Sequence, residues 1–199
     1  MLDFDLLDLE QGSDEWHSWR ASGIGASEAS SIMGENRWKS RRQLFDQKLD
    51  AYLGFSDGRG LENMAMAEGT RLEPIARQAY IEQTGIAVEP ICIQSRRYPW
   101  MLASLDGLCI ESKTVIEIKC GNSAYRYTSQ SGRVPDYYYA QLQHILAICE
   151  FEGIDFWCFI QKKTPILISV PRNQSYIEDL VDREVIFWRQ IKGDYPRER

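Results

Sequence analysis

The chain has 199 residues, a mass of 23.1 kDa and a formal net charge of -6 at pH 7. Its hydrophobic fraction of 44% and charged fraction of 26% are those of ordinary globular proteins, so global disorder, collagen and coiled coil are excluded. No apolar run approaches the roughly 20 residues of a membrane-spanning helix, and the acidic N-terminus does not resemble a signal peptide. We therefore expect one domain over residues 1–199, located in the cytoplasm.

The cysteines and the overall charge bound the chemistry further. Five cysteines form no CxxC pair, and only His17 and His144 accompany them, so we expect free thiols and no structural zinc. A pI of about 5.1 argues mildly against a nucleic-acid-binding protein. That argument concerns the average charge, however, and a local basic patch or a ring-shaped assembly can reverse it.

The N-terminal half is expected to be mainly helical. Residues 1–14 alternate acidic and apolar side chains and predict a strand or an arm, and 21–25 read as a flexible turn. Helical periodicity and a stop at Gly34 or Gly85 define the helices that follow. The helices expected here cover residues 15–20, 26–33, 40–50 and 62–84. In the last of them, Pro74 either kinks the helix or starts its second half, and the side chains expected in the core are Leu72, Ile75, Ala76, Ala79 and Tyr80.

The C-terminal half is expected to be richer in strands. Strand-like segments follow one another at 86–93, 97–103, 107–111 and 114–119. A helix over 136–149, a hairpin formed by 154–162 and 165–171, and a final helix over 174–192 complete the chain. This order predicts an α/β fold with one central mixed β-sheet flanked by helices.

The segment from Ser104 to Lys119 contains the most informative side chains. Residues two apart on a strand share a face, so Glu117 and Lys119 project together. A hairpin folded about 111–113 returns Asp106, expected in a turn, to a place beside Glu117. Two carboxylates and a lysine then converge on one point.

This set suits metal-assisted hydrolysis of a phosphodiester. Mg²⁺ prefers carboxylate and carbonyl oxygens, and a lysine on the same face can position a water molecule or stabilise developing charge. The alternative is a surface ion pair between Glu117 and Lys119 beside a turn aspartate. Glu73 is a further carboxylate candidate, although a solvated helix face is its ordinary setting, as it is for Gln141.

Six short blocks occur in the order found in one known nuclease family. The blocks are Gly12-Ser13-Asp14-Glu15-Trp16 with Trp19-Arg20, Gly25-Ala26-Ser27-Glu28, Glu68-Gly69 with Glu73-Pro74, Ser104-Leu105-Asp106-Gly107, Glu117-Ile118-Lys119-Cys120 and Tyr139-Ala140-Gln141-Leu142-Gln143. Together they resemble the lambda exonuclease family, also called YqaJ-like viral recombinases, within the PD-(D/E)xK nucleases. The resemblance covers residues 11 to about 145. The proline that this group often has before the aspartate is Leu105 here.

The resemblance implies a restriction-endonuclease-like core and assigns roles within it. Asp106 and Glu117 are the expected Mg²⁺ ligands, with the carbonyl of Ile118 assisting and Mn²⁺ as an alternative ion. Lys119 is expected to activate or orient the attacking water. Glu73 is expected to support the metal and water site, and Gln141 to line it.

The resemblance also implies contacts with a DNA end. The positions that match the family's 5′-phosphate pocket are Arg20, Ser27 and Ser104, where a guanidinium and hydroxyls suit phosphate. Their alternatives are a surface charge for Arg20 and a plain helix N-cap for Ser27. The position that matches an apolar wedge, which splits the terminal base pair, falls at Met66, although helical methionines are usually core residues.

The function implied is a Mg²⁺-dependent 5′→3′ exonuclease. It would digest one strand of linear double-stranded DNA to mononucleotides and leave a 3′ single strand for a single-strand annealing protein in phage recombination. The family assembles as a ring-shaped homotrimer around the duplex. The alternatives are an endonuclease or a single-strand exonuclease on the same core, or a catalytically silent DNA-binding recombination scaffold.

A basic DNA-facing side would reconcile the acidic pI with this function. Four acids and no base lie in the first ten residues, and these side chains would face outward. The acids of the last helix, from Glu178 to Glu184, are expected on a solvated face, with a docking site as the alternative. The basic candidates are Arg37, Lys39, Arg41 and Arg42 around Trp38, with Arg126, Arg133, Lys162 and Lys163.

Overall fold

The computed structural model describes residues 2–55 and 64–194, with side chains of the second range from residue 71 onward. The strands are β1 (Phe4–Leu7), β2 (Ile24–Gly25), β3 (Glu89–Ser95), β4 (Met101–Cys109), β5 (Thr114–Lys119), β6 (Gly153–Cys158) and β7 (Ile166–Pro171). The helices are α1 (Asp14–Ala21), the 3-10 turn η1 (Ala26–Glu28), α2 (Ala29–Met33), α3 (Arg41–Tyr52), α4 (Met64–Thr84), α5 (Asn122–Ser131), α6 (Asp136–Cys149) and α7 (Gln174–Lys192).

One mixed sheet organises the molecule, as the sequence predicted. Its strand order is β1-β3-β4-β5-β6-β7, and the short β2 pairs with β4. The pairs β5–β6 and β2–β4 are parallel, and the other pairs are antiparallel. A parallel neighbour requires a crossover, and the chain between β5 and β6 supplies it through α5 and α6.

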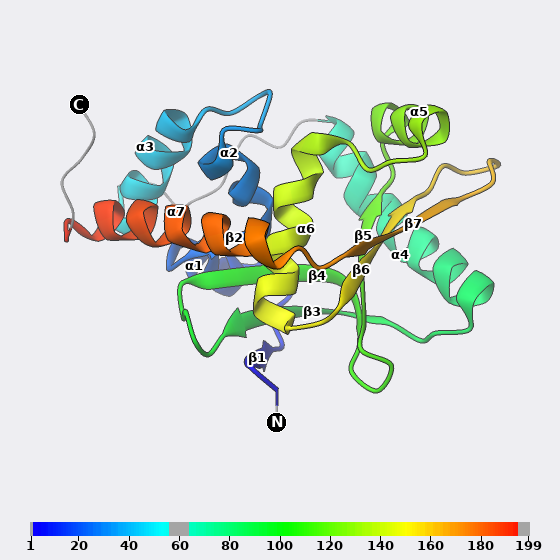
Figure 1. Ribbon diagram of the computed structural model, residues 1–199, viewed down its shortest axis with the longest axis horizontal. Helices are drawn as coiled ribbons and strands as arrows, with labels where there is room; N and C mark the ends of the chain where they lie inside the picture. The colour runs from blue at the N-terminus through cyan, green and yellow to red at the C-terminus, as the bar shows by residue number, and fades with distance from the viewer. Residues whose placement is uncertain (1, 56–63, 195–199) are drawn as a thin grey trace.

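Helices cover both faces of the sheet (Figure 1). Ala76 and Tyr80 of α4 pack against Ile116, Ile118 and Trp157 on one face. The larger cluster on the other face joins the inward side of α6 to the strands and to Ile177 of α7. Because the strands alternate their side chains, the side chains of β5 are buried on both faces, and a polar residue there needs an internal partner.

The observed elements confirm most of the expected ones and correct several. The expected strands 97–103 and 107–111 are one continuous strand, β4, so Asp106 lies within a strand and not in a turn. The expected flexible turn contains β2, whose two residues pair with Met101 and Leu102. The helix α5 was not predicted, because its sequence from Asn122 to Ser131 is mostly polar and has the composition of a loop.

The helix α4 also departs from expectation at one position. Pro74 lies inside it without ending it. Ile75 was predicted to be in the core but is 44% exposed. Within the described residues, no helix has the length and apolarity needed to cross a bilayer.

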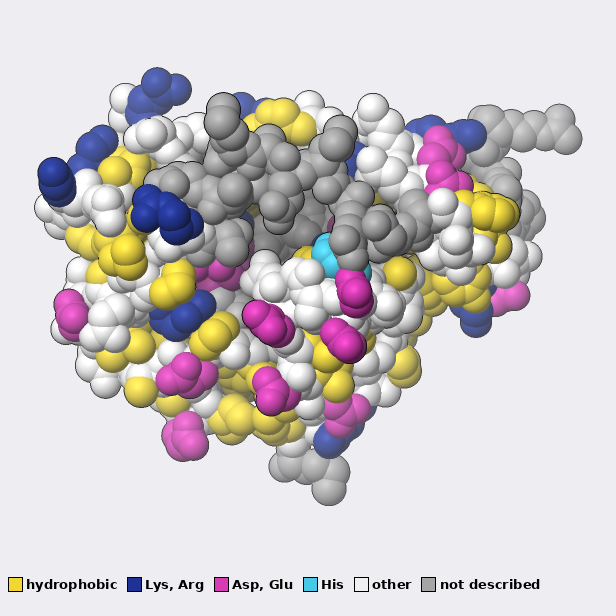
Figure 2. Space-filling model, turned by 180° about the vertical axis from the view of Figure 1, so that it is seen from behind, with side chains coloured by type: hydrophobic (Ala, Val, Ile, Leu, Met, Phe, Trp, Pro, Cys, Tyr) yellow, Lys and Arg dark blue, Asp and Glu magenta, His cyan; other side chains and the backbone are white. Residues whose placement is uncertain are grey.

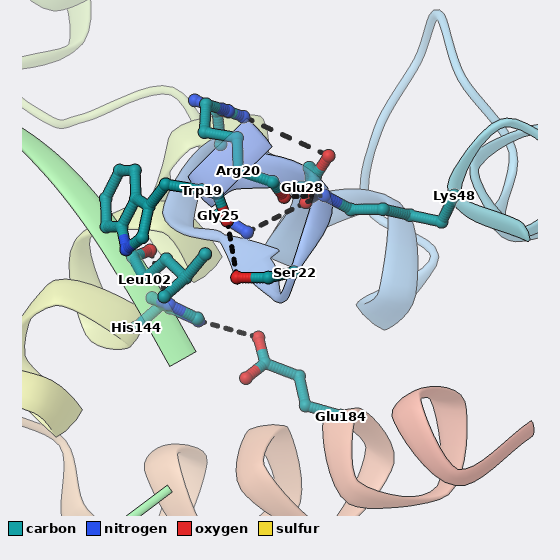
Figure 3. A network of polar contacts seen from close by, with 10 residues as sticks. Trp19, Arg20, Ser22, Gly25, Glu28, Lys48, Leu102, His144 and Glu184 are labelled. Atoms are coloured by element: carbon teal, nitrogen blue, oxygen red, sulfur yellow. Dashed lines mark hydrogen bonds and ion pairs between the residues drawn. The ribbon is translucent and has the colours of Figure 1, made fainter. Parts of the chain in front are cut away.

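A buried polar pair joins α6 to α7. His144 and Glu184 are both fully buried, and His144 Nδ1 lies 2.8 Å from Glu184 Oε1 (Figure 3). The other ring nitrogen lies 3.2 Å from the carbonyl oxygen of Leu102 in β4. The prediction of a solvated face is therefore wrong for Glu184. It holds for Glu178, Asp179 and Asp182, which are exposed.

Candidate active site

The divergence of β4 from β5 creates the centre of the site. Their pairing ends at Gly107 and Ile116, so the next residues along β5 lose their partner strand on that side. Asp106 turns its carboxylate into this gap, and Oδ2 accepts a hydrogen bond from the Ile118 N–H at 2.7 Å. The side chain of Asp106 therefore takes the place of a strand partner, which fixes it close to β5.

Glu117 and Lys119 point from β5 toward α6, as the strand period predicted. Glu117 is 2% exposed, and its Oε1 accepts from Lys119 Nζ at 2.5 Å and from Gln141 Nε2 at 2.8 Å. The other carboxylate oxygen, Oε2, is buried and has no hydrogen-bond partner among the described residues. A buried carboxylate oxygen without a donor is costly unless a ligand supplies its partner.

The charges in this cluster perturb one another strongly. Burial raises the pKa of Asp106 well above its usual range, and the neighbouring Glu117 carboxylate adds to this effect. Burial acts against charge on Lys119, but the carboxylates of Glu117 and Asp106 outweigh it and raise the pKa of that amine. Lys119 is thus held as a cation beside two acids.

Two side chains of α4 and one of α6 surround the centre. The pKa of Glu73 is raised by burial, with Lys119 opposing and Glu117 adding to this effect, so Glu73 lies within electrostatic reach of both. Arg77, one helical turn further on, donates from Nε to the carbonyl oxygen of Asp106 at 2.5 Å. The ring of Tyr138 lies 4.8 Å from Lys119 Nζ.

This donor set fits a hard divalent cation. Asp106 and Glu117 provide carboxylate oxygens, and the unpartnered Oε2 of Glu117 is the oxygen that such an ion would satisfy. Among the side chains that the structure describes, no group of three or more His, Cys, Asp or Glu forms a metal centre. Two carboxylates would leave several positions on the ion for backbone oxygen, water or phosphate, which is the usual arrangement for Mg²⁺.

A second cluster contains the residues matched to a phosphate pocket. Arg20 Nη2 donates to Ser27 Oγ at 3.3 Å, and its guanidinium stacks over the Trp16 ring at 4.8 Å. Trp16 Nε1 donates to Ser104 Oγ at 2.9 Å, so the indole connects Arg20 with Ser104. Ser104 and Asp106 share a strand face two residues apart, and this places the cluster next to the carboxylates.

The sequence reasoning missed three residues that hold these clusters. Arg77 contacts β4 as described above, and Glu28 and Lys48 form an ion pair at 2.9 Å beside Arg20 (Figure 3). Lys48 is 5% exposed and lies four residues after the inward-facing Leu44. A lysine at a core position of an amphipathic helix was the signal that could have identified it.

The other residues predicted to contact DNA differ in their exposure and in their contacts. Trp38 is 68% exposed beside the exposed Arg37, whose guanidinium stacks over Tyr137 at 4.6 Å. Arg41 instead packs toward α7, donating to Gln190 Oε1 at 2.8 Å. The backbone of Met66 belongs to α4, but its side chain lies outside the described residues, so the wedge stays a prediction.

Charged side chains are unevenly distributed on the face seen in Figure 2. Acidic side chains gather in its lower part, and Lys and Arg gather at the upper left margin, where α5 and the β6–β7 turn lie. The four basic candidates of that region are exposed, namely Arg126, Arg133, Lys162 and Lys163.

Comparison with known proteins places these features in one family. The family model described as the YqaJ-like viral recombinase domain matches residues 15–152. The protein YqaJ of Bacillus subtilis (strain 168) is 27% identical over 184 residues, which are 90% of this chain and 56% of that protein. The chain thus spans about half the length of this curated relative.

The chain is also similar to solved structures of exonucleases. An alkaline exonuclease, LHK-Exo from Laribacter hongkongensis, has a TM-score of 0.81 at 26% identity, covering 92% of this chain and 94% of that one. Its complex with dAMP has a TM-score of 0.80 at 25% identity, with the same coverage. A phage-related exonuclease from Haemophilus somnus 129PT, 13% identical with a TM-score of 0.63 over 86% of this chain and 96% of that one, shares the fold. The chain belongs to the YqaJ-like viral recombinase family.

Proposed function

We propose that this protein is a Mg²⁺-dependent exonuclease that degrades one strand of linear double-stranded DNA from its 5′ end. The observation that carries the proposal is the convergence of Asp106, Glu117 and Lys119 around a buried carboxylate oxygen without a partner. The family and the similarity to an alkaline exonuclease support nuclease chemistry at this cluster.

Each residue of the cluster has a distinct task in this proposal. Asp106, whose carboxylate accepts from the Ile118 N–H, and Glu117 would hold Mg²⁺. The backbone carbonyl of Ile118 would be a third donor. When bound, Mg²⁺ polarises the phosphodiester and lowers the pKa of a water molecule. Lys119, kept cationic by the two acids, orients the attacking oxygen and stabilises the charge that develops on phosphate.

Glu73 and Gln141 complete the surroundings. Glu73 lies within electrostatic reach of Lys119 and would support the metal and water site. Gln141 donates to Glu117 Oε1 and thereby directs the second oxygen, Oε2, toward the site. A digestion of linear duplex with Mg²⁺, with Mn²⁺ and with EDTA tests the metal requirement. We expect degradation with either added ion and none in EDTA; degradation in EDTA would contradict a metal-dependent mechanism.

The product and the polarity rest on two further observations. The relative LHK-Exo is described in complex with dAMP, a nucleoside monophosphate, which supports the release of mononucleotides here. The Arg20, Ser27 and Ser104 cluster adjoins the carboxylates and presents donors suited to phosphate. A terminal 5′-phosphate held there would place the first phosphodiester at the catalytic centre.

Replacing Arg20 with alanine is expected to remove the preference for phosphorylated 5′ ends. The guanidinium supplies charge-assisted hydrogen bonds that alanine cannot, so the rate ratio between 5′-phosphate and 5′-hydroxyl duplexes should fall roughly tenfold or more. Arg96→Ala, which breaks an exposed ion pair with Asp5 elsewhere, is the control. An unchanged ratio would remove Arg20 from the pocket.

Replacing Gly25 with alanine is expected to weaken the same preference. An added Cβ would lie 2.8 Å from Arg20 Nη2, so the guanidinium must move. The rate ratio should fall less than in Arg20→Ala, while the rate on 5′-hydroxyl ends stays near that of the natural protein. Gly121→Ala is the matched control because nothing lies within 4 Å of its added Cβ. Equal ratios for the two glycine variants would contradict the prediction.

The proposed partners follow from this activity. The substrate is a double-stranded DNA end, and the exposed basic residues near α5 and around Trp38 would contact it. We propose a homotrimeric ring that encloses the duplex, and a single-strand annealing protein that takes up the remaining 3′ strand in phage recombination. Measurement of molar mass in solution tests the trimer.

A further inference from the structure

A buried ion pair lies behind the proposed phosphate pocket and takes no part in the chemistry described above. It joins Lys48 of α3 to Glu28 of η1, with Nζ and Oε2 2.9 Å apart (Figure 3). The side chains are 6% and 16% exposed. A buried pair of this kind rarely adds much stability over an apolar pair, so its presence calls for another reason.

Lys48 holds two parts of the pocket at once. Its Nζ contacts Glu28 and also donates to the carbonyl oxygen of Arg20 at 2.8 Å. Because that carbonyl is at the end of α1, the contact fixes the backbone from which the Arg20 side chain projects. A charged donor at the last carbonyls of a helix is favourable in itself.

The two carboxylate oxygens of Glu28 have unequal surroundings. Oε2 is engaged twice, by Lys48 and by the Gly25 N–H at 2.8 Å. Oε1 lies 3.9 Å from Arg20 Nη2, which is beyond hydrogen-bond length. Burial disfavours the ionised form of Glu28, but Lys48 and Arg20 outweigh it and lower the pKa of this carboxyl. An ionised carboxylate thus attracts Arg20 without a close contact.

This arrangement leaves the guanidinium donors of Arg20 available for a phosphate. An arginine beside an unengaged carboxylate forms a bidentate pair, which would occupy the donors that phosphate requires. Here Lys48 occupies the carboxylate, and Arg20 Nη2 turns to Ser27 instead. The same guanidinium stays over the Trp16 ring, which fixes its plane.

We infer that Lys48 is a positioning residue for 5′-phosphate recognition: it occupies Glu28 so that this carboxylate orients Arg20 and does not capture it. The inference rests on the proposed phosphate pocket and explains how a neighbouring charge keeps Arg20 positioned in it. It assigns specificity to a lysine that does not contact the substrate.

The test compares four variants with the natural protein: Lys48→Gln, Lys48→Gln with Glu28→Gln, Arg20→Ala, and the control Lys192→Gln on the exposed end of α7. Lys48→Gln keeps a donor for the Arg20 carbonyl but removes the charge. If Lys48→Gln does not fold, Lys48→Met serves as a second variant without the charge. Binding of duplex with a 5′-phosphate or a 5′-hydroxyl is measured by fluorescence anisotropy in EDTA, and KM and kcat are measured on both ends with Mg²⁺.

Lys48→Gln is expected to lower the binding preference for the phosphorylated end about tenfold, which corresponds to about 1.4 kcal/mol. The change should appear in KM for that end, with kcat on 5′-hydroxyl ends nearly unaltered. The double variant should recover the preference to within about threefold of the natural protein, because an amide cannot capture Arg20 as a carboxylate does.

Three results would overturn the inference. If Arg20→Ala loses the preference but Lys48→Gln keeps it, the pocket stands and Lys48 has no part in it. If the double variant is no better than Lys48→Gln, Lys48 supports the backbone and no carboxylate is being restrained. An Arg20→Ala variant that retains the preference overturns the pocket itself, and the inference with it.

Discussion

Replacing Lys119 with alanine is expected to reduce the rate of cleavage by roughly a hundredfold to a thousandfold, while DNA binding persists. The amine is a cation held 2.5 Å from Glu117 and close to Asp106, so its loss removes the positive charge nearest the proposed reaction. Losses of this size are typical when one group that stabilises a transition state is removed. Single-turnover rates with saturating Mg²⁺ measure the effect.

The control for this variant is Lys192→Ala, an exposed lysine whose partner is Asp194 at 3.5 Å on the surface. It should cleave at the natural rate, which would show that the effect depends on position and not on net charge. Binding of both variants to linear duplex is measured in EDTA. If Lys119→Ala loses binding together with cleavage, the lysine has a structural role and its proposed part in the chemistry is wrong.

Replacing Asp106 with asparagine is expected to abolish cleavage and leave the fold as stable as before, or more stable, without Mg²⁺. Asparagine can still accept from the Ile118 N–H, but it no longer offers a carboxylate to the ion. Burial and Glu117 raise the pKa of Asp106, so its ionised form costs stability in the absence of a cation. The variant removes that cost together with the metal site.

The raised pKa of Asp106 also sets how the stability of the natural protein changes with pH. A carboxyl whose pKa is raised on folding binds more protons in the folded state, so the cost is absent below the unfolded pKa of about 4 and grows above it. In EDTA, the Tm of Asp106→Asn relative to the natural protein should therefore rise as the pH increases from about 4 to 7.

Adding Mg²⁺ should raise the Tm of the natural protein only. Asp155→Asn, an acid bonded to Tyr80 and Ser169, is the control for general loss of charge. A Mg²⁺-induced Tm rise that persists in Asp106→Asn would contradict its role as a ligand.

The convergence of the three catalytic candidates was predictable because it depends on strand geometry. The period of two places Glu117 and Lys119 on one face, and the hairpin turn at 111–113 is where the sequence put it. The continuity of β4 through Asp106 was not predictable, because Ser104 and Gly107 have the composition of a turn. In the structure, Gly107 lies where an added Cβ would meet Ile116 and Val88, so packing and not turning requires it.

The contacts that support the site could not be predicted from the sequence, for a different reason. Arg77, Lys48 and His144 act through partners 29, 28 and 42 residues away, and no local pattern encodes such a distance. Only their environment distinguishes them, because a charged or polar side chain on the inward face of a helix needs a buried partner. Positions of this kind in an amphipathic helix therefore indicate tertiary contacts even when the partner is unknown.

Digestion of a linear duplex with a 5′-phosphate on one strand tests the central claim most directly. The second strand begins with a 5′-hydroxyl, closed circular DNA is included, and each reaction is run with Mg²⁺ and with EDTA. We expect preferential loss of the phosphorylated strand as mononucleotides in Mg²⁺, with circles intact and no loss in EDTA. Cut circles would indicate an endonuclease on the same core, and no cleavage of any substrate would indicate a DNA-binding scaffold; either result would contradict the account.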